Sequence, residues 1–128
     1  MHHICGEEVD REIAEVAVKA FGRICADWGL TPREAAALAG MTPHDWARHA
    51  GGETTGLSRD VLMRISAAVG IHLALARVVG APRAARWMTR PNTGPLFAGA
   101  RPIDVAMAGD APTLLSIRSS LEALSEGL

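Results

Sequence analysis

The chain has 128 residues, of which 48% are hydrophobic and 21% are charged, and its formal net charge is −1. This length allows one or two small cores and argues against a large enzyme domain. No apolar run approaches the roughly 20 residues that a membrane helix needs, and the acidic residues 1–8 do not resemble a signal peptide. We therefore expect a cytoplasmic protein that does not contact a membrane.

The charge is unevenly distributed along the chain. Residues 31–90 carry eight basic and four acidic residues, a net charge of +4, whereas residues 1–30 and 91–128 carry −3 and −2. The basic middle is compatible with contacts to phosphate groups, but a charge of this size does not demonstrate them.

Residues 8–28 predict one long amphipathic helix. Cys25 lies on its apolar face, and neither Cys5 nor Cys25 belongs to a CxxC motif, so we expect Cys25 to be a buried reduced thiol. Gly29 is expected to end the helix. The apolar face follows the three- and four-residue spacing of a helix through Val9, Ile13, Val16, Ala17, Ala20, Phe21, Ile24, Cys25 and Trp28.

Two short helices follow, each with a threonine at its N-cap and a proline at its first position. Thr31 and Glu34 form the pattern of a capping box, and the first helix ends at Gly40. Thr42 opens the second helix, which reaches about residue 50 and in which we expect Trp46 to be buried. This pair predicts a helix-turn-helix, although any compact helical hairpin would carry the same capping residues.

The second half of the chain predicts five more helices and a loop. Ser58 caps a helix expected to end at Gly70, and residues 71–79 continue the apolar pattern in a further helix. A helix from Pro82 carries Trp87 and is stopped by Pro91.

The loop of residues 91–101 is rich in glycine and proline, yet it contains the apolar pair Leu96 and Phe97. Helices restart at Pro102 and after Asp110, and no strand alternation is visible. We therefore expect an all-α fold, with residues 1–80 forming an N-terminal helix plus helix-turn-helix bundle and residues 81–128 forming a small second domain.

The sequence gives no support for catalysis, a cofactor or a metal site. The five histidines are scattered, without an HExxH motif or a Cys/His cluster at ligand spacing. Neither cysteine has neighbours that would activate a thiolate, and no glycine-rich phosphate loop is present. We do not expect an enzyme.

From Gly29 onward the chain resembles the Xre/MbcA/ParS antitoxins, in which an Xre-like helix-turn-helix precedes a toxin-binding domain. In the second domain the resemblance rests on the order and spacing of short motifs. These motifs are residues 84–88 (Ala-Ala-Arg-Trp-Met), 90–92 (Arg-Pro-Asn), 95–99 (Pro-Leu-Phe-Ala-Gly), 102–104 (Pro-Ile-Asp) and 119–124 (Ser-Ser-Leu-Glu-Ala-Leu).

The resemblance implies a type II antitoxin. Such proteins bind RES-domain toxins, which consume NAD⁺, and cover the entrance to the toxin's active site, while the helix-turn-helix represses the operon; a homodimer is also implied. The implied toxin-binding residues are Trp87, Arg90, Pro91, Asn92, Leu96, Phe97, Arg101 and the last helix with its tail to Leu128. The implied DNA-binding residues are Thr42, His44, Asp45 and Arg48.

The chain departs from the family pattern in two places. Thr93 and Gly94 look like a two-residue insertion before the segment that corresponds to the family's Pro-Leu-Phe-Gly-Gly-Arg-Ser/Thr-Pro. In that segment of this chain, Ala100 and Arg101 stand where the family has Arg-Ser/Thr. The recognition helix has Arg48 as its one fixed cation, whereas many relatives carry several arginines there.

Other interpretations of these residues remain open. One of Leu96 and Phe97 could fold back onto Trp87, which is itself as compatible with a core position as with an interface. Arg90 and Asn92 could simply satisfy backbone carbonyls at the end of a helix. The whole chain could be a stand-alone helix-turn-helix regulator with a C-terminal dimerisation region, or a toxin-binding protein that has lost its affinity for an operator.

Overall fold

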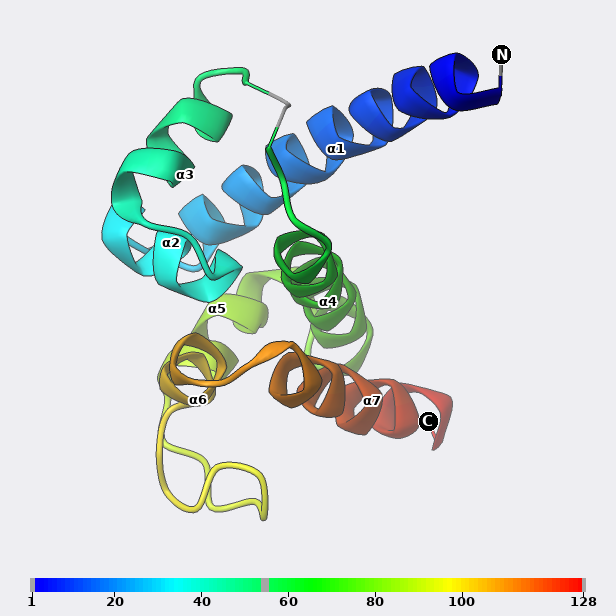
Figure 1. Ribbon diagram of the computed structural model, residues 1–128. Helices are drawn as coiled ribbons and strands as arrows, with labels where there is room; N and C mark the ends of the chain where they lie inside the picture. Colours follow the sequence, from blue (N-terminus) through cyan, green and yellow to red (C-terminus); the bar gives the residue numbers. More distant parts are fainter. Residues whose placement is uncertain (1, 54–55, 128) are drawn as a thin grey trace.

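The computed structural model describes residues 2–53 and 56–127, with the backbone alone described for residues 2–10. These residues form seven α-helices and no strand (Figure 1), which confirms the all-α prediction. The helices are α1 (His2–Asp27), α2 (Pro32–Ala39), α3 (Pro43–Ala50), α4 (Arg59–Val78), α5 (Ala81–Thr89), α6 (Pro102–Ala108) and α7 (Ala111–Gly127).

Helix α4 is the centre of the bundle and contacts α1, α2, α5 and α7. The predicted break at Gly70 was wrong, because α4 continues through this glycine to Val78. A Cβ atom at position 70 would lie 2.5 Å from Cδ of Arg118 on α7, so the missing side chain lets α7 approach closely. This packing outweighs the cost of about 1 kcal/mol for a glycine inside a helix.

By length and composition alone, α4 could also cross a membrane. The sequence did not predict an apolar helix of this length, because the apolar pattern was divided into two helices at Gly70. The core helix of a bundle has the same properties, and the buried side chains of α4 face the other helices. These buried residues are Val61, Ile65, Ala67, Ala68, Ile71, Ala74 and Leu75.

Helix α1 buries a different stripe from the predicted one at its N-terminal end. Phe21, Ile24, Cys25 and Trp28 are buried as expected, and burial raises the pKa of the Cys25 thiol to about 12. Val16, however, is exposed. At 3.6 residues per turn, position 16 lies about 140° around the helix from position 21. Position 13 lies about 80° from it, at the edge of the stripe, and Ile13 is exposed too.

The capping predicted for α2 and α3 is confirmed. The Glu34 backbone N–H donates to the Thr31 hydroxyl, and the Thr31 backbone N–H donates to the Glu34 carboxylate, closing the capping box. Gly40 ends α2 in a left-handed conformation, with φ of 74°. Trp46 of α3 is buried and meets Phe21 of α1 edge-on, with ring centroids 5.3 Å apart.

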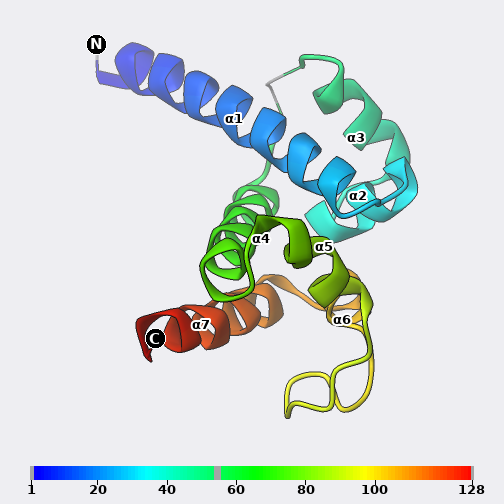
Figure 2. The same cartoon turned by 180° about the vertical axis from the view of Figure 1, so that it is seen from behind.

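The second half of the chain packs on the other side of α4. Helix α5 contacts α4 and α6, and α6 contacts α2 and α7. Seen from behind in Figure 2, α5 lies next to α4, and the loop of residues 90–101 extends away from the helices. The helix carrying Trp87 ends at Thr89 and the next begins at Pro102, as predicted.

The two isoleucines of α1 offer a test of this register. Ile24→Ala should lower the free energy of unfolding by about 2–5 kcal/mol because it empties a packed site, since Ile24 is 6% exposed. Ile13→Ala, at a residue that is 58% exposed, should change it by no more than about 0.5 kcal/mol. Urea denaturation followed by circular dichroism measures both, and equal losses would contradict the register.

Candidate functional site

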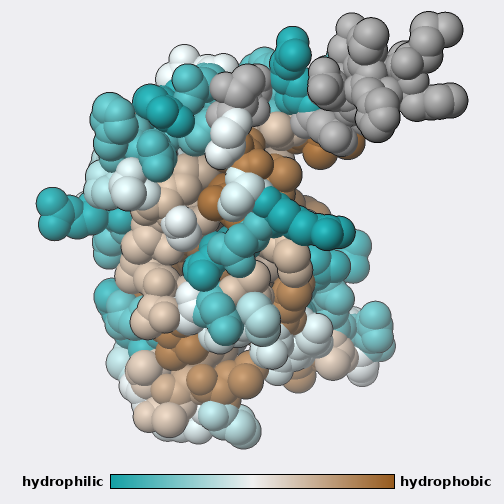
Figure 3. Space-filling model, in the orientation of Figure 1, coloured by the Kyte–Doolittle hydropathy of each residue, from teal (hydrophilic) through white to brown (hydrophobic). Residues whose placement is uncertain are grey.

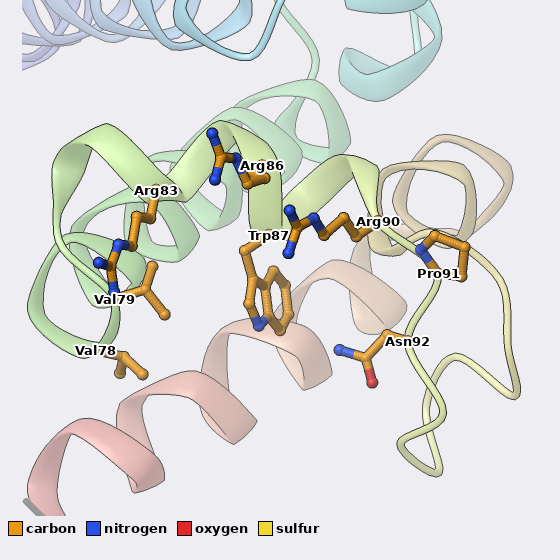
Figure 4. A pocket seen from close by; sticks show the side chains of 8 residues that line it. All are labelled: Val78, Val79, Arg83, Arg86, Trp87, Arg90, Pro91 and Asn92. Atoms are coloured by element: carbon orange, nitrogen blue, oxygen red, sulfur yellow. The ribbon is translucent and has the colours of Figure 1, made fainter.

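A groove runs along one side of α5. It has a volume of about 510 Å³, and Trp87, Arg90, Pro91 and Asn92, which the sequence singled out, all line it. Figure 4 shows their side chains together with those of the last turn of α4. The complete lining is Val78, Val79, Arg83, Arg86, Trp87, Arg90, Pro91 and Asn92.

Residues 92–100 form a loop closed by its own backbone. The Asn92 N–H donates to the Ala100 carbonyl (3.0 Å), and the Gly99 N–H donates to the Asn92 carbonyl (2.8 Å). The Asn92 side-chain oxygen accepts a hydrogen bond from the Gly94 N–H (2.8 Å). Asn92 therefore shapes the loop through its oxygen, which accepts from a backbone N–H; this contact is not the predicted one to backbone carbonyls at the end of a helix.

The loop orients its two apolar residues differently. Phe97 is 9% exposed and meets Trp87 edge-on, with ring centroids 5.7 Å apart, so it is the member of the pair that folds back. Leu96 is 43% exposed. Figure 3 shows apolar surface over this loop, at the lower left of the view. The Phe97 contact thus holds Leu96 outward at the tip of a fixed loop.

Ala98 has a φ of 49° and precedes Gly99, whose φ is 91°. The left-handed backbone conformation costs a residue with a Cβ atom about 1 kcal/mol or more. The family pattern places a glycine at this position, where the same conformation costs nothing. The strain is local, and the closing hydrogen bonds of the loop offset it.

Arg101 is held against the first turn of α6. Its guanidinium donates two hydrogen bonds to the Asp104 carboxylate, at 2.8 and 2.7 Å. This pair raises the pKa of Arg101 and lowers the pKa of Asp104. Arg101 does not line the groove. Leu128, also singled out by the sequence, lies outside the described residues; the last exposed large apolar side chain before it is Leu124 on α7.

The four residues implied in DNA binding lie together on α3, and three of them are engaged in local interactions. The Thr42 hydroxyl caps the helix by accepting from the Asp45 N–H. Arg48, the fixed cation of this helix, lies 2.9 Å from the Glu53 carboxylate and 3.7 Å from that of Asp45. His44 is exposed. The positive charge of α3 is therefore largely neutralised within the chain.

Residues 74–127 match the family of the antitoxin Xre/MbcA/ParS C-terminal toxin-binding domain. The match supports the antitoxin family. It covers the whole lining of the groove, the loop and α7 up to Gly127. No curated protein and no solved structure matches the chain.

A protein toxin is the partner that this family implies, and the family is not a class of enzymes. The matched segment begins inside α4, so a division of the chain between residues 80 and 81 stays a prediction. Helices α2 and α3, the predicted helix-turn-helix, lie before the match.

The sequence interpretation missed two residues of the groove. Arg83 and Arg86 line it beside Arg90, but only Arg90 was singled out as a toxin-binding residue, although Arg86 also stands in a family motif, that of residues 84–88. The spacing of Arg83 and Arg86, one turn apart on a predicted helix, was the available signal for this pair.

Phe97→Ala should open the loop, because it removes the ring that packs on Trp87. We expect the backbone amides of Asn92 and Gly99, which close the loop, to exchange with deuterium at least tenfold faster than in the unaltered chain. Leu96→Ala is the matched control and should leave both rates unchanged, since Leu96 is exposed. Equal rates in the two variants would show that the aromatic contact does not hold the loop.

Proposed function

We propose that the chain is a type II antitoxin that binds a RES-domain, NAD⁺-degrading toxin in the cytoplasm and blocks the entrance to its active site. The observation that carries the proposal is the match of residues 74–127 to a toxin-binding domain. The groove of α5 and the outward Leu96 of the neighbouring loop support it, because both are accessible and lie within the matched segment.

The inhibition we propose is steric. An aromatic ring and arginines beside an exposed leucine have the composition of an interface, in which a few such residues carry most of the binding energy. The loop of residues 92–100 is held by its own hydrogen bonds and by Phe97, so little conformational entropy is lost when it docks. The antitoxin supplies a rigid surface and no catalytic group.

We further propose that a homodimer of the chain represses its own operon through α2 and α3. The threonine caps and the buried Trp46 support a helix-turn-helix. The pairing of Arg48 with Glu53 favours a second candidate, a toxin-binding protein without operator affinity. A stand-alone regulator with a C-terminal dimerisation region would leave the groove and Leu96 without a role.

The toxin-binding proposal predicts a loss of affinity for Leu96→Ala. Its affinity for the toxin encoded beside the chain should fall by about 1–2 kcal/mol, as for an interface residue of moderate weight. Met63→Ala is the control, because Met63 is similarly exposed (40%) but lies before residues 74–127. Isothermal titration calorimetry measures the affinity of both variants for the toxin. An unchanged affinity for Leu96→Ala would show that this loop is not part of the interface.

The operator proposal predicts opposite effects for the two members of the α3 ion pair. Glu53→Gln should strengthen binding to the upstream DNA because it frees Arg48 for a phosphate or base, whereas Arg48→Ala should weaken it. Gel-shift titrations at several salt concentrations measure both, and the affinity should fall as salt rises. Absence of a specific complex for the unaltered chain and for Glu53→Gln would favour the second candidate.

A further inference from the structure

We propose that the groove beside α5 binds an acidic segment of the toxin, whose carboxylates pair with Arg83, Arg86 and Arg90. This inference rests on the proposed function and adds the chemistry of the partner. It also gives roles to Arg83 and Arg86, which the resemblance did not assign to toxin binding.

The first support is the absence of carboxylates from this part of the sequence. No aspartate or glutamate occurs between Asp60 and Asp104, whereas this stretch contains six arginines. Arg64 pairs with Asp60, and Arg101 pairs with Asp104, at the two ends of the stretch. Within it, the chain provides no acidic neighbour in sequence for the arginines of α5.

The second support is the geometry of the three arginines. Arg83 and Arg86 lie three residues apart on α5, and Arg90 follows the last residue of that helix with extended backbone. All three are exposed and line one groove, and Figure 4 shows Trp87 between Arg83 and Arg90. Among the described side chains, none of the three takes part in a salt bridge, whereas Arg48, Arg64, Arg101 and Arg118 all do.

Like charges at this spacing repel one another, so the arrangement costs the free protein some stability. A bound carboxylate would remove that repulsion. Guanidinium groups bind carboxylates through two parallel hydrogen bonds, which adds direction to the attraction. The three arginines are therefore arranged for an anion that comes from outside the chain.

The rest of the lining favours a peptide over a nucleic acid. Val78, Val79, Trp87 and Pro91 provide apolar contact between and beside the arginines, which suits carboxylates interspersed with apolar side chains. The groove lies within the segment matched to a toxin-binding domain and receives no residue from α2 or α3. Its volume of about 510 Å³ accommodates a few side chains.

Charge removal tests the proposal. We expect Arg83→Ala, Arg86→Ala and Arg90→Ala, combined in one variant, to raise the Kd for the adjacently encoded toxin at least tenfold at low salt and to flatten its salt dependence. Arg33→Ala, Arg59→Ala and Arg77→Ala, combined, form the control with the same change of charge outside the groove, at three exposed arginines. Circular dichroism confirms that each variant is folded.

A zero-length cross-link provides a second test that does not depend on loss of affinity. The chain has a single lysine, Lys19, so Lys19→Arg removes the one side-chain amine and leaves the α-amino group as the remaining background. Arg86→Lys in that variant keeps the charge of the groove and introduces an amine. A carbodiimide activates a toxin carboxylate, the amine attacks it, and an amide forms as the urea leaves. We expect mass spectrometry to find position 86 joined to an aspartate or glutamate of the toxin, and Arg59→Lys in the same background to give no such link.

The outcomes separate this inference from the proposed function. If the unaltered chain does not bind the toxin, both fail. If the complex forms but the triple groove variant binds as tightly as the unaltered chain and no cross-link appears at position 86, the inference fails and the proposed function stands. If the triple groove variant keeps its affinity for the toxin and loses only its binding to the upstream DNA, the inference fails and the groove binds phosphates. If it loses only its self-association, the inference also fails and the groove binds a second copy of the chain.

Discussion

The close packing of α7 on α4 is the contact on which the rest of the second half depends. Gly70 in the middle of α4 leaves room there for the side chain of Arg118, which lies where a Cβ atom would be. Arg118 in turn pairs with Glu122 of α7. With α7 against one side of α4 and α5 against another, the groove and the loop are attached to the same helix that supports α1 and α2.

Helix α4 also connects the two halves through Arg64. Its guanidinium pairs with Asp60 and donates to the carbonyl of Gly109, at the turn between α6 and α7. The same side chain lies against Gly40, where a Cβ atom would come within 2.8 Å of it. The turn between α2 and α3 and the turn that precedes α7 therefore share one arginine, and the two predicted functional regions belong to a continuous packed unit.

Local signals in the sequence predicted the fold well. Threonine caps, first-turn prolines and the proline after Thr89 act within a few residues, so they fixed the bounds of α2, α3 and α5. Gly70 and Val16 were misinterpreted because their environment depends on which other helices pack against them. Arg118 of α7 covers Gly70, whereas the side chain of Val16 is exposed. Helix propensity and hydrophobic periodicity do not indicate which other helix will pack against a given residue.

The candidate site was predicted in part, and for a similar reason. The family motifs pointed to Trp87, Arg90, Pro91 and Asn92, which the fold brings into one groove. Arg83 stands in no motif, and the motif that contains Arg86 implied no toxin-binding role for it. The importance of both appears only when the distribution of carboxylates is compared with the lining of the groove. The sequence could not decide between Leu96 and Phe97, because both are apolar neighbours; the turn geometry directs one inward and the other outward.

The central claim is that the chain inhibits a toxin by covering its active site. The most direct measurement is the rate at which the purified, adjacently encoded toxin consumes NAD⁺ while the chain is added in increasing amounts. The account predicts that consumption falls to the background rate once the chain reaches a fixed stoichiometric ratio to the toxin. A toxin that consumes NAD⁺ at an undiminished rate in the presence of excess chain would contradict it.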